Sequence, residues 1–565
     1  MPEQTTPRNS AGASSDRLIA SILVLTFCLA GLLTLDHYGL TFDETWHLFT
    51  ADRYFRFWVT FDRTLLDFSQ PHPADNQPVN HPVFERRDNE PRSAVANTLY
   101  GLSYWLLSST LHWLDPVDAY HLPVILMAGG TLAVVYVMGK EAIGQTAAFF
   151  ATLALGLSPR FLAHAHFNIK DTPKTLFFSL TIWAFWRASV HRDWQWMLGS
   201  AAMCGLAFGT RVNAVLIAPI VLPWLVVLLL SQGRPRPPAS HRWWAALCGY
   251  PFVASIIWVV TWPLMFVAPL DTLKSFIDHW LFLGFGAHCL STWSPYGILY
   301  IVTTTPLVIL LPSLIGIVTA VREIRSNPRR TGLLLILWAS VPVLRTALPR
   351  ATNYDGIRQF MEFLPALCLL AGLGAQRLVE ALKLSLRQTM PQSVTLGVLG
   401  LAFLPILTKV IQIHPHELAY FNPLVGGLAG ARRLNIPDAT DYWGSSHRQG
   451  IAWLNANAEP GAQLYVNDGN TNMVMPVSHI WLREDITLLT PDTLGQELPV
   501  PLYVAHVARP RWYDQIDLYC EENLEPVYSI RVDDTPIFNI FYLEVSPWLT
   551  QKPKREQHSN DCHSG

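Results

Sequence analysis

The run LIASILVLTFCLAGLLTLDHYGL (residues 18–40) is long and apolar enough to cross the roughly 30 Å of hydrocarbon in a bilayer. Directly after it comes TFDETWHLFTADRYFRFW (residues 41–58), in which Asp43 and Glu44 stand side by side ahead of several aromatic residues. Carboxylates are among the costliest side chains to hold near hydrocarbon, so a pair at this position indicates a functional site. The two stretches together predict a membrane helix that delivers two acids to the membrane boundary.

The composition of the whole chain also indicates a membrane protein. Of its 565 residues, 50% are hydrophobic and 15% are charged, and the mean hydropathy is +0.24. Soluble domains carry about 25% charged residues, so this chain is too apolar for an ordinary soluble fold. A formal net charge of −2 does not suggest a nucleic-acid partner, and seven cysteines without a CxxC pair do not suggest a metal or disulfide framework.

Apolar runs of spanning length recur along the chain. They lie near residues 18–40, 94–114, 121–138, 145–165, 173–190, 196–210, 212–231, 243–266, 297–320, 331–348, 360–377 and 395–412. Basic loops mark the cytoplasmic side of membrane proteins. The loops rich in Arg and Lys are 186–194, 231–243, 321–330 and 376–388. We therefore expect the N-terminus inside and everything after residue 412 outside.

An inside N-terminus and an outside C-terminus require an odd number of crossings, so one early run should not span the membrane fully. The runs 121–138 and 145–165, joined by GKEAIG, are the best candidates. We expect about 11 transmembrane helices, with about 13 as the alternative.

The same features divide the chain into parts. Residues 1–17 are polar and predict a disordered cytoplasmic N-terminus, and residues 18–412 form the transmembrane domain with a first external loop at 41–92. Residues 413–550 predict a soluble extracytoplasmic α/β domain, followed by a disordered tail at 551–565. In that domain AQLYVND, PLYVAHVA and IFNIFYLEV have strand character, and SSHRQGIAWLNANA has helical character.

A further acid precedes a later apolar run on the same external face. It is Asp171, in AHAHFNIKDTPKT (residues 163–175). Acids that meet at one membrane boundary from distant parts of the chain indicate a built site, although Asp43 and Glu44 could instead only cap a helix end. A carboxylate in a partly desolvated cleft has a raised pKa and can act as a general base, here toward a hydroxyl acceptor.

Basic residues gather at the same boundary. Lys170 and Lys174 flank Asp171, and Arg350 and Arg358 lie in LPRATNYDGIRQFMEFLP (residues 348–365). Free positive charge is not expected on the external side. Guanidinium groups suit a phosphate, which they bind bidentately, so we predict that these residues bind an anionic donor. The lysines could alternatively be interface anchors whose ammonium groups reach toward lipid headgroups.

The 19 histidines include small groups in HPHELAYFN (residues 414–422) and NHPVFE (residues 80–85). No HExxH or similar ligand spacing accompanies them. The pattern therefore favours hydrogen-bonded loop histidines over a metal site.

In their order, these motifs resemble the membrane glycosyltransferases of family 39, relatives of the protein O-mannosyltransferases and of the lipid A aminoarabinose transferase. The likeness rests on the Asp-Glu pair, an HP dipeptide late in the first loop, HFNIKDTP, YDGIRQF and the external C-terminal domain, and it covers about residues 18–412. It implies a polytopic α-helical membrane protein with a GT-C-like fold. It also implies inverting transfer of a sugar from a polyprenyl phosphate to a hydroxyl acceptor outside the cytoplasm.

The resemblance also implies roles for individual residues. Asp43 matches the catalytic base with Glu44 beside it, Asp171 matches a second acidic residue, and Arg358 would contact the donor phosphate. His81 stands where relatives have His-Pro-Pro-Leu, but this chain reads HPVFERR and lacks the second proline and the leucine. That departure leaves open how the loop meets the donor.

The resemblance implies a bacterial inner membrane and leaves several points open. Some relatives of this fold need a divalent ion and others do not, so no metal is assigned. The acceptor could be a protein, a lipid or a glycan. Three other classes of protein also fit parts of the pattern: a transporter or flippase, an assembly protein whose tail binds a partner, and a ligase of lipid-linked glycans. A transporter would place binding residues near the middle of the bilayer and often shows repeated halves, which this sequence lacks.

Overall fold

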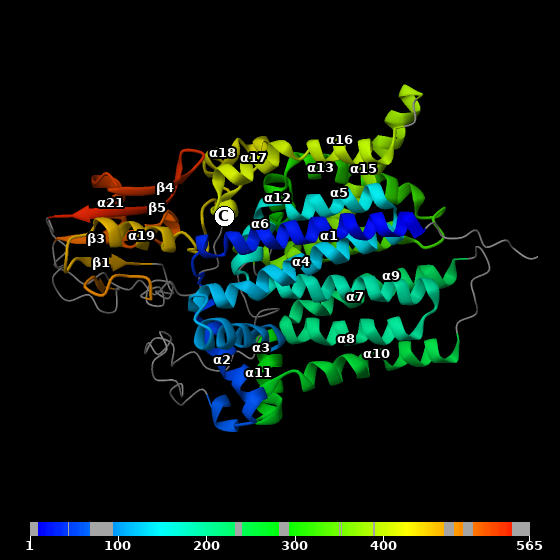
Figure 1. The fold of residues 1–565 in the computed structure, drawn as a ribbon, viewed down its shortest axis with the longest axis horizontal. Coiled ribbons are helices and arrows are strands. Elements are labelled where there is room, and N and C mark those ends of the chain that lie inside the picture. Colours follow the sequence, from blue (N-terminus) through cyan, green and yellow to red (C-terminus); the bar gives the residue numbers. More distant parts are fainter. Residues whose placement is uncertain are drawn as a thin grey trace, which may run out of the picture.

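The computed structural model describes residues 10–42, 44–67, 94–231, 240–281, 293–349, 351, 353–387, 390–467, 480–489 and 501–544. Long helices lie side by side through most of the molecule, and a small sheet with its own helices lies at one end of them (Figure 1). The structure thus has a helical part and a C-terminal α/β part, in the order expected.

The helical part consists of α1 (Ser10–Leu33), α2 (Glu44–Thr60), α3 (Ala94–Ser103), α4 (Pro116–Ala142), α5 (Gln145–Gly156), α6 (Pro159–Phe167), α7 (Asp171–His191), α8 (Trp194–Thr210), α9 (Ile217–Leu230), α10 (His241–Val260), α11 (Pro269–Leu281), α12 (Tyr296–Thr304), α13 (Leu307–Glu323), α14 (Thr331–Ala347), α15 (Leu364–Leu386), α16 (Gln392–Leu401) and α17 (Leu404–Ile413). Several begin at capping residues. Asp115 accepts from the Val117 N–H (2.8 Å) at the start of α4, and Asp193 accepts from the Gln195 N–H (2.9 Å) at the start of α8.

Within the described residues, 6 helical stretches are long and apolar enough to cross a membrane, or 7 if a bent pair counts as one span. The expectation of an integral membrane protein with many helices is therefore confirmed. The bent pair is α5 and α6, which meet at 63° where Pro159 begins the second helix. The bend falls in the run 145–165, one of the two candidates for the single run that we expected not to cross fully. The number of crossings stays a prediction.

Helix α15 packs closely against α13 and α5, because glycines remove the side chains between the backbones. A Cβ on Gly316 of α13 would overlap the carbonyl of Leu370, and one on Gly374 of α15 would overlap the carbonyl of Pro312. Gly372 faces the backbone of Ala147 in the same way. These contacts fix α15 in the bundle.

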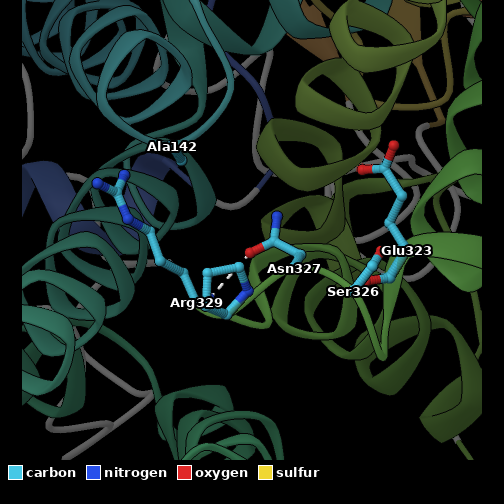
Figure 2. A pocket seen from close by; sticks show the side chains of 6 residues that line it. Ala142, Glu323, Ser326, Asn327 and Arg329 are labelled. Atoms are coloured by element: carbon cyan, nitrogen blue, oxygen red, sulfur yellow. Dashed lines mark hydrogen bonds between the residues drawn. The ribbon is translucent and has the colours of Figure 1, made fainter. Parts of the chain in front are cut away.

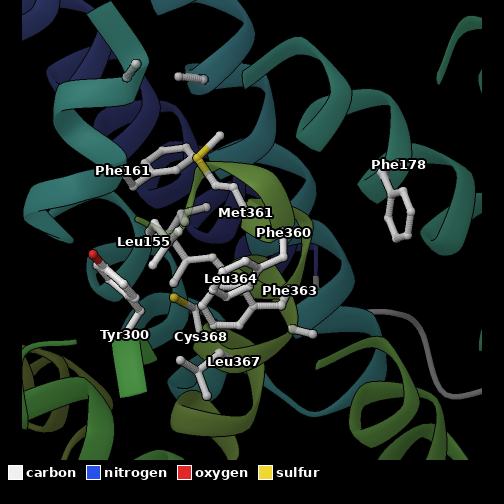
Figure 3. Close-up of a cluster of buried hydrophobic side chains, with 14 of the residues drawn as sticks. Leu155, Phe161, Phe178, Tyr300, Phe360, Met361, Phe363, Leu364, Leu367 and Cys368 are labelled. Carbon is white, nitrogen blue, oxygen red and sulfur yellow. The ribbon is translucent and has the colours of Figure 1, made fainter. Parts of the chain in front are cut away.

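A 3₁₀ turn, Arg358–Phe363, leads directly into α15. Its apolar residues Phe360, Met361 and Phe363 are buried in the core with Leu155 and Phe161 of α5 and α6 (Figure 3). Because the apolar side of the turn is held in this core, the positions of its polar residues are fixed as well.

The C-terminal part holds α18 (Gly427–Arg433), α19 (His447–Asn457), α21 (Gln515–Asn523) and the strands β1 (Gln463–Val466), β2 (Thr487–Leu489), β3 (Leu502–Val507), β4 (Tyr528–Val532) and β5 (Thr535–Leu543). The strands form one sheet in the order β2-β1-β3-β5-β4. Strand β1 pairs in parallel with β2 and β3, whereas β5 pairs antiparallel with β3 and β4. The three stretches with strand character coincide with β1, β3 and β5, and the helical stretch coincides with α19.

The two faces of this sheet are covered by different helices. Leu464 of β1 belongs to the same buried cluster as Ile451 of α19, whereas Val504 of β3 lies in a separate cluster with Ile516 of α21. Alternate residues of a strand point to opposite faces, so the sheet is the middle layer of an α/β/α arrangement.

Candidate functional site

Glu44, the first residue of α2, is fully buried near the N-terminal end of α4. Its Oε2 accepts a hydrogen bond from the Thr41 N–H (2.7 Å), and its Oε1 lies 2.6 Å from Nε2 of His121 in α4. Both oxygens are thus engaged, which fixes the start of α2. The neighbouring Asp43 lies outside the described residues, as do Arg350 and His81.

Asp171 begins α7 and is also fully buried. The side chain of Asn168 organises this turn: Oδ1 accepts from the Asp171 N–H (2.8 Å), and Nδ2 donates to Oδ2 of Asp171 (3.2 Å). Oδ1 of Asp171 is ion-paired with Arg211, which follows α8. The motif NIKD therefore forms a capped helix start whose carboxylate faces a cation from another helix.

Lys174 lies one turn into α7 and is fully buried between two acids. Its Nζ is 3.1 Å from Oδ1 of Asp171 and 2.7 Å from Oε2 of Glu362, in the 3₁₀ turn before α15. Lys170, at the N-terminus of α7, is 8% exposed and thus lies at the edge of the same group. The structure brings Asp171, Lys170 and Lys174 together with the turn that carries Arg358.

Arg358 is 3% exposed, and its Nε donates to Oδ2 of Asp355 (3.0 Å). Its guanidinium carbon lies 4.5 Å from the ring centre of Trp443 and 5.0 Å from that of Tyr354. An acid and two aromatic rings therefore hold the guanidinium in place.

The C-terminal part contributes directly to this region. Nη2 of Arg509, which follows β3, lies 2.6 Å from Oδ1 of Asp438 and 3.2 Å from Oδ1 of Asp355. Nη1 of Arg509 donates to the carbonyl of Tyr442 (2.9 Å). The candidate site is thus built at the junction of the helical part and the α/β part.

Sequence reasoning did not single out several charged or polar residues of this junction. They are His121, Arg160, Arg211, Asp355, Glu362, Asp438, Tyr442 and Arg509. Asp355 and Glu362 stand in the stretch around Arg358, so their proximity to it was a usable signal. The others come from distant segments, and no local spacing marks them.

Positive charge is in excess in this region. In the network of ion pairs and close contacts around Asp171 and Arg358, the buried or half-buried cations are Arg160, Lys170, Lys174, Arg211, Arg345, Arg358 and Arg509, whereas the buried acids are Asp171, Asp355, Glu362 and Asp438. Burying a charge is costly unless it is compensated, so such an excess is what a site for an anionic ligand requires. Among the described residues, no group of three or more His, Cys, Asp and Glu could hold a metal ion.

A cavity of about 310 Å³ lies far from this junction, beside Ala142 at the other end of α4 (Figure 2). It is lined by Glu323 at the end of α13 and by Ser326, Asn327 and Arg329 of the loop that follows, where the Arg329 N–H donates to Oδ1 of Asn327 (2.9 Å). Its lining lies in one of the basic loops expected on the cytoplasmic side. It contains none of the predicted site residues.

The helical bundle, its polar cluster at one end and the α/β part on that end define a class: a polytopic membrane protein with a buried, cation-rich site. Residues 103–262 match the family model described as dolichyl-phosphate-mannose-protein mannosyltransferase. The family resemblance stated from the sequence is therefore confirmed. A search of curated proteins finds no match.

Solved structures match over most of the chain. The structure of ArnT from Cupriavidus metallidurans bound to undecaprenyl phosphate is 15% identical, with a TM-score of 0.50, and the match covers 94% of this chain and 98% of that one. This likeness confirms the expected GT-C-like fold. The archaeal oligosaccharyltransferase AglB from Archaeoglobus fulgidus, in complex with an inhibitory peptide and a dolichol-phosphate, is 12% identical with a TM-score of 0.44, covering 84% of this chain and 65% of that one.

Proposed function

We propose that the protein is an integral membrane glycosyltransferase that moves a hexosyl or pentosyl group from a polyprenyl-phosphate donor to a hydroxyl acceptor. The observation that carries the proposal is the buried excess of positive charge around Arg358. Two comparisons support it: the matching family model is named for a dolichyl-phosphate-linked mannose, and a solved protein of this fold binds undecaprenyl phosphate.

In this proposal the cations bind the donor phosphate. Arg358 takes a phosphate oxygen, with Lys170, Lys174 and Arg350 adding positive charge around the same group. Arg358 and Lys174 already form ion pairs with acids, so both side chains are in position before the donor binds. A lipid phosphate stabilised in this way is a good leaving group, so the reaction requires no strong general acid.

The acids then act on the acceptor. Asp43 is the general base that takes the proton of the acceptor hydroxyl, while the acceptor oxygen bonds to the anomeric carbon and the bond from that carbon to the phosphate oxygen breaks. One displacement of this kind inverts the anomeric configuration. Glu44 fixes the start of α2 beside the base through Thr41 and His121, and Asp171 orients Lys174 and Arg211.

The proposed setting follows the pattern of basic loops. About 11 helices cross a bacterial inner membrane, and the junction with the α/β part lies on the extracytoplasmic side. The first external loop carries His81, which we place near the donor. The acceptor is a hydroxyl of a protein, a lipid or a glycan.

The test is sugar transfer by the purified protein in detergent from a radiolabelled polyprenyl-phosphate sugar. Asp43→Asn should lower turnover by about 10² to 10⁴, the usual contribution of a general base, with donor binding retained. Asp36→Asn is the matched control, because Asp36 is an exposed acid a short distance before Asp43 in the chain, in the 3₁₀ turn Leu35–His37 that follows α1. Equal turnover in wild type and Asp43→Asn would remove Asp43 from the chemistry. Phosphate binding without turnover of any donor would instead favour a flippase.

A further inference from the structure

Arg160, near the start of α6, is a buried cation with an incomplete set of partners. Its side chain is 1% exposed, and Nε donates to the carbonyl of Tyr420 (3.3 Å). Nη1 and Nη2 are both buried and have no hydrogen-bond partner among the described residues. A guanidinium carries five N–H donors, so most of its hydrogen-bonding capacity is unused.

Aromatic rings surround this guanidinium in place of acids. Its carbon lies 4.8 Å from the ring centre of Phe421, 5.4 Å from that of Tyr300 and 5.8 Å from that of Tyr442. Rings attract a cation through their faces, but they do not accept the in-plane N–H bonds of an arginine. The rings therefore hold the guanidinium and leave its donors available.

The turn that carries Arg358 passes directly beside Arg160. A Cβ on Gly356 would lie 2.6 Å from Nη1 of Arg160 and 2.9 Å from Oη of Tyr442, and Gly356 has a φ of +65°. Only glycine fits this position without strain and without a clash. The segment from Asp355 to Arg358 thus brings two guanidinium groups into one region. That of Arg358 is paired with Asp355, whereas the Nη atoms of Arg160 have no partner among the described residues.

On the basis of the proposed function, we propose that Arg160 is an additional anion-binding residue of this site. Its Nη hydrogens would be donated to an oxygen of the donor phosphate. A phosphate beside the turn would receive hydrogen bonds from Arg160 and Arg358, because the backbone of Gly356, two residues before Arg358, lies directly against Arg160. A bidentate guanidinium–phosphate contact is among the stronger hydrogen-bonded pairs. It would compensate a buried cation that, within the described part of the chain, is surrounded by rings and one carbonyl.

The experiment measures how strongly the purified protein in nanodiscs prefers polyprenyl phosphate to the neutral polyprenol, with inorganic phosphate as a competitor. Arg160→Met should lower that preference by about ten- to a hundredfold, the range for a lost hydrogen bond to a charged group. Binding of polyprenol should be unchanged. Arg160→Lys, which keeps the charge and loses the planar fork, should retain part of the preference. Competition by inorganic phosphate should show whether the anion alone occupies the site or needs its lipid.

Arg187→Met is the matched control, because Arg187 also lies over a ring, that of Trp196 (4.6 Å), and pairs with Glu141 at the other end of the bundle. It should leave the preference unchanged. If Arg160→Met keeps the wild-type preference, or weakens both lipids equally, Arg160 has only a structural role and the inference is wrong. If the wild-type protein itself shows no preference for the phosphate, the proposed function fails as well.

Discussion

Lys174 illustrates how single residues of the site serve structure and function together. Its ammonium lies between Asp171 (3.1 Å) and Glu362 (2.7 Å), and none of the three side chains reaches solvent. Removing one partner of a buried ion pair leaves an uncompensated charge, which costs far more than the pair contributes. Such a residue is constrained by its neighbours before any ligand arrives.

Lys174→Met should therefore destabilise the protein by about 3 to 5 kcal/mol, because Glu362 is left without its ammonium partner. Adding Glu362→Gln should restore part of that loss. Chemical denaturation in detergent measures both. Lys409→Met is the control: it removes a half-exposed pair with Asp533 and should cost no more than about 1 kcal/mol. A double variant no more stable than Lys174→Met would contradict the account.

At the scale of single residues, the sequence identifies the charged residues of the site but not most of the residues that pair with them. Asp171, Lys174 and Arg358 are recognisable because charge at a membrane boundary is unusual. Asp355 lies three residues before its partner Arg358, but Arg211 and Glu362, the partners of Asp171 and Lys174, are distant in sequence until the fold brings them together. Pairing across distant segments depends on helix packing, which no local spacing records.

At the scale of elements, the approach of α13 to α15 depends on glycine. Gly316→Ala should destabilise the protein by about 1 to 3 kcal/mol, because the added methyl would meet the carbonyl of Leu370 and the helices would have to separate. Gly397→Ala in α16 is the matched control, since nothing lies within 4 Å of its Cβ position. That change should be neutral or stabilising by up to about 1 kcal/mol. Thermal unfolding measures the change in stability of both variants. Equal destabilisation by Gly316→Ala and Gly397→Ala would contradict the close approach of α13 to α15.

A second element-scale feature is the contact of β3 with α21. His506 is buried with Nδ1 2.9 Å from Asp517 and Nε2 2.8 Å from Glu521. Burial alone would lower the pKa of His506, but the two carboxylates outweigh it and raise the pKa to about 9. The same contacts, together with Asn539, lower the pKa of Glu521 to about 2 against the effect of burial.

This raised pKa predicts a pH-dependent stability. A histidine whose pKa is higher in the folded than in the unfolded state contributes fully below about pH 6.5, and the contribution is lost as the pH rises through about 9. The loss should reach about 3 kcal/mol. Hydrogen exchange of β3 in the full-length protein, corrected for its intrinsic pH dependence, should show less protection at pH 9.5 than at pH 6.5. In His506→Gln the difference should disappear, and its persistence would contradict the assignment.

At the scale of the whole molecule, the α/β part completes the candidate site. Arg509→Met should lower donor turnover at least about tenfold, because Asp355 and Asp438 lose a shared cation and the position of Arg358 is disturbed. Arg483→Met in the same part is the control, since Arg483 pairs with the half-exposed Asp485 at the surface. Turnover measured with both variants distinguishes a site residue from general damage to the fold. Unchanged turnover in Arg509→Met would separate the α/β part from the reaction.

The order of the helical and α/β parts could be predicted from the sequence, but the contacts between them could not. Apolar runs and basic loops indicate a membrane bundle with one soluble part, and short β-type runs between turn residues indicate β1, β3 and β5. The parity of crossings indicated only that one run, 121–138 or 145–165, does not span fully, and it did not predict the bend between α5 and α6. The docking of Arg448 of α19 on Asp118 of α4 (2.6 Å) had no sequence signal, because it joins two separately patterned parts.

The most direct test of the central claim is an experimental structure of the protein in nanodiscs with a bound polyprenyl-phosphate sugar. We expect the phosphate to lie beside Arg358, within hydrogen-bonding reach of its guanidinium, with the sugar toward the start of α2. A phosphate bound elsewhere, such as in the cavity beside Ala142 and Arg329 at the opposite end of the bundle, would contradict it.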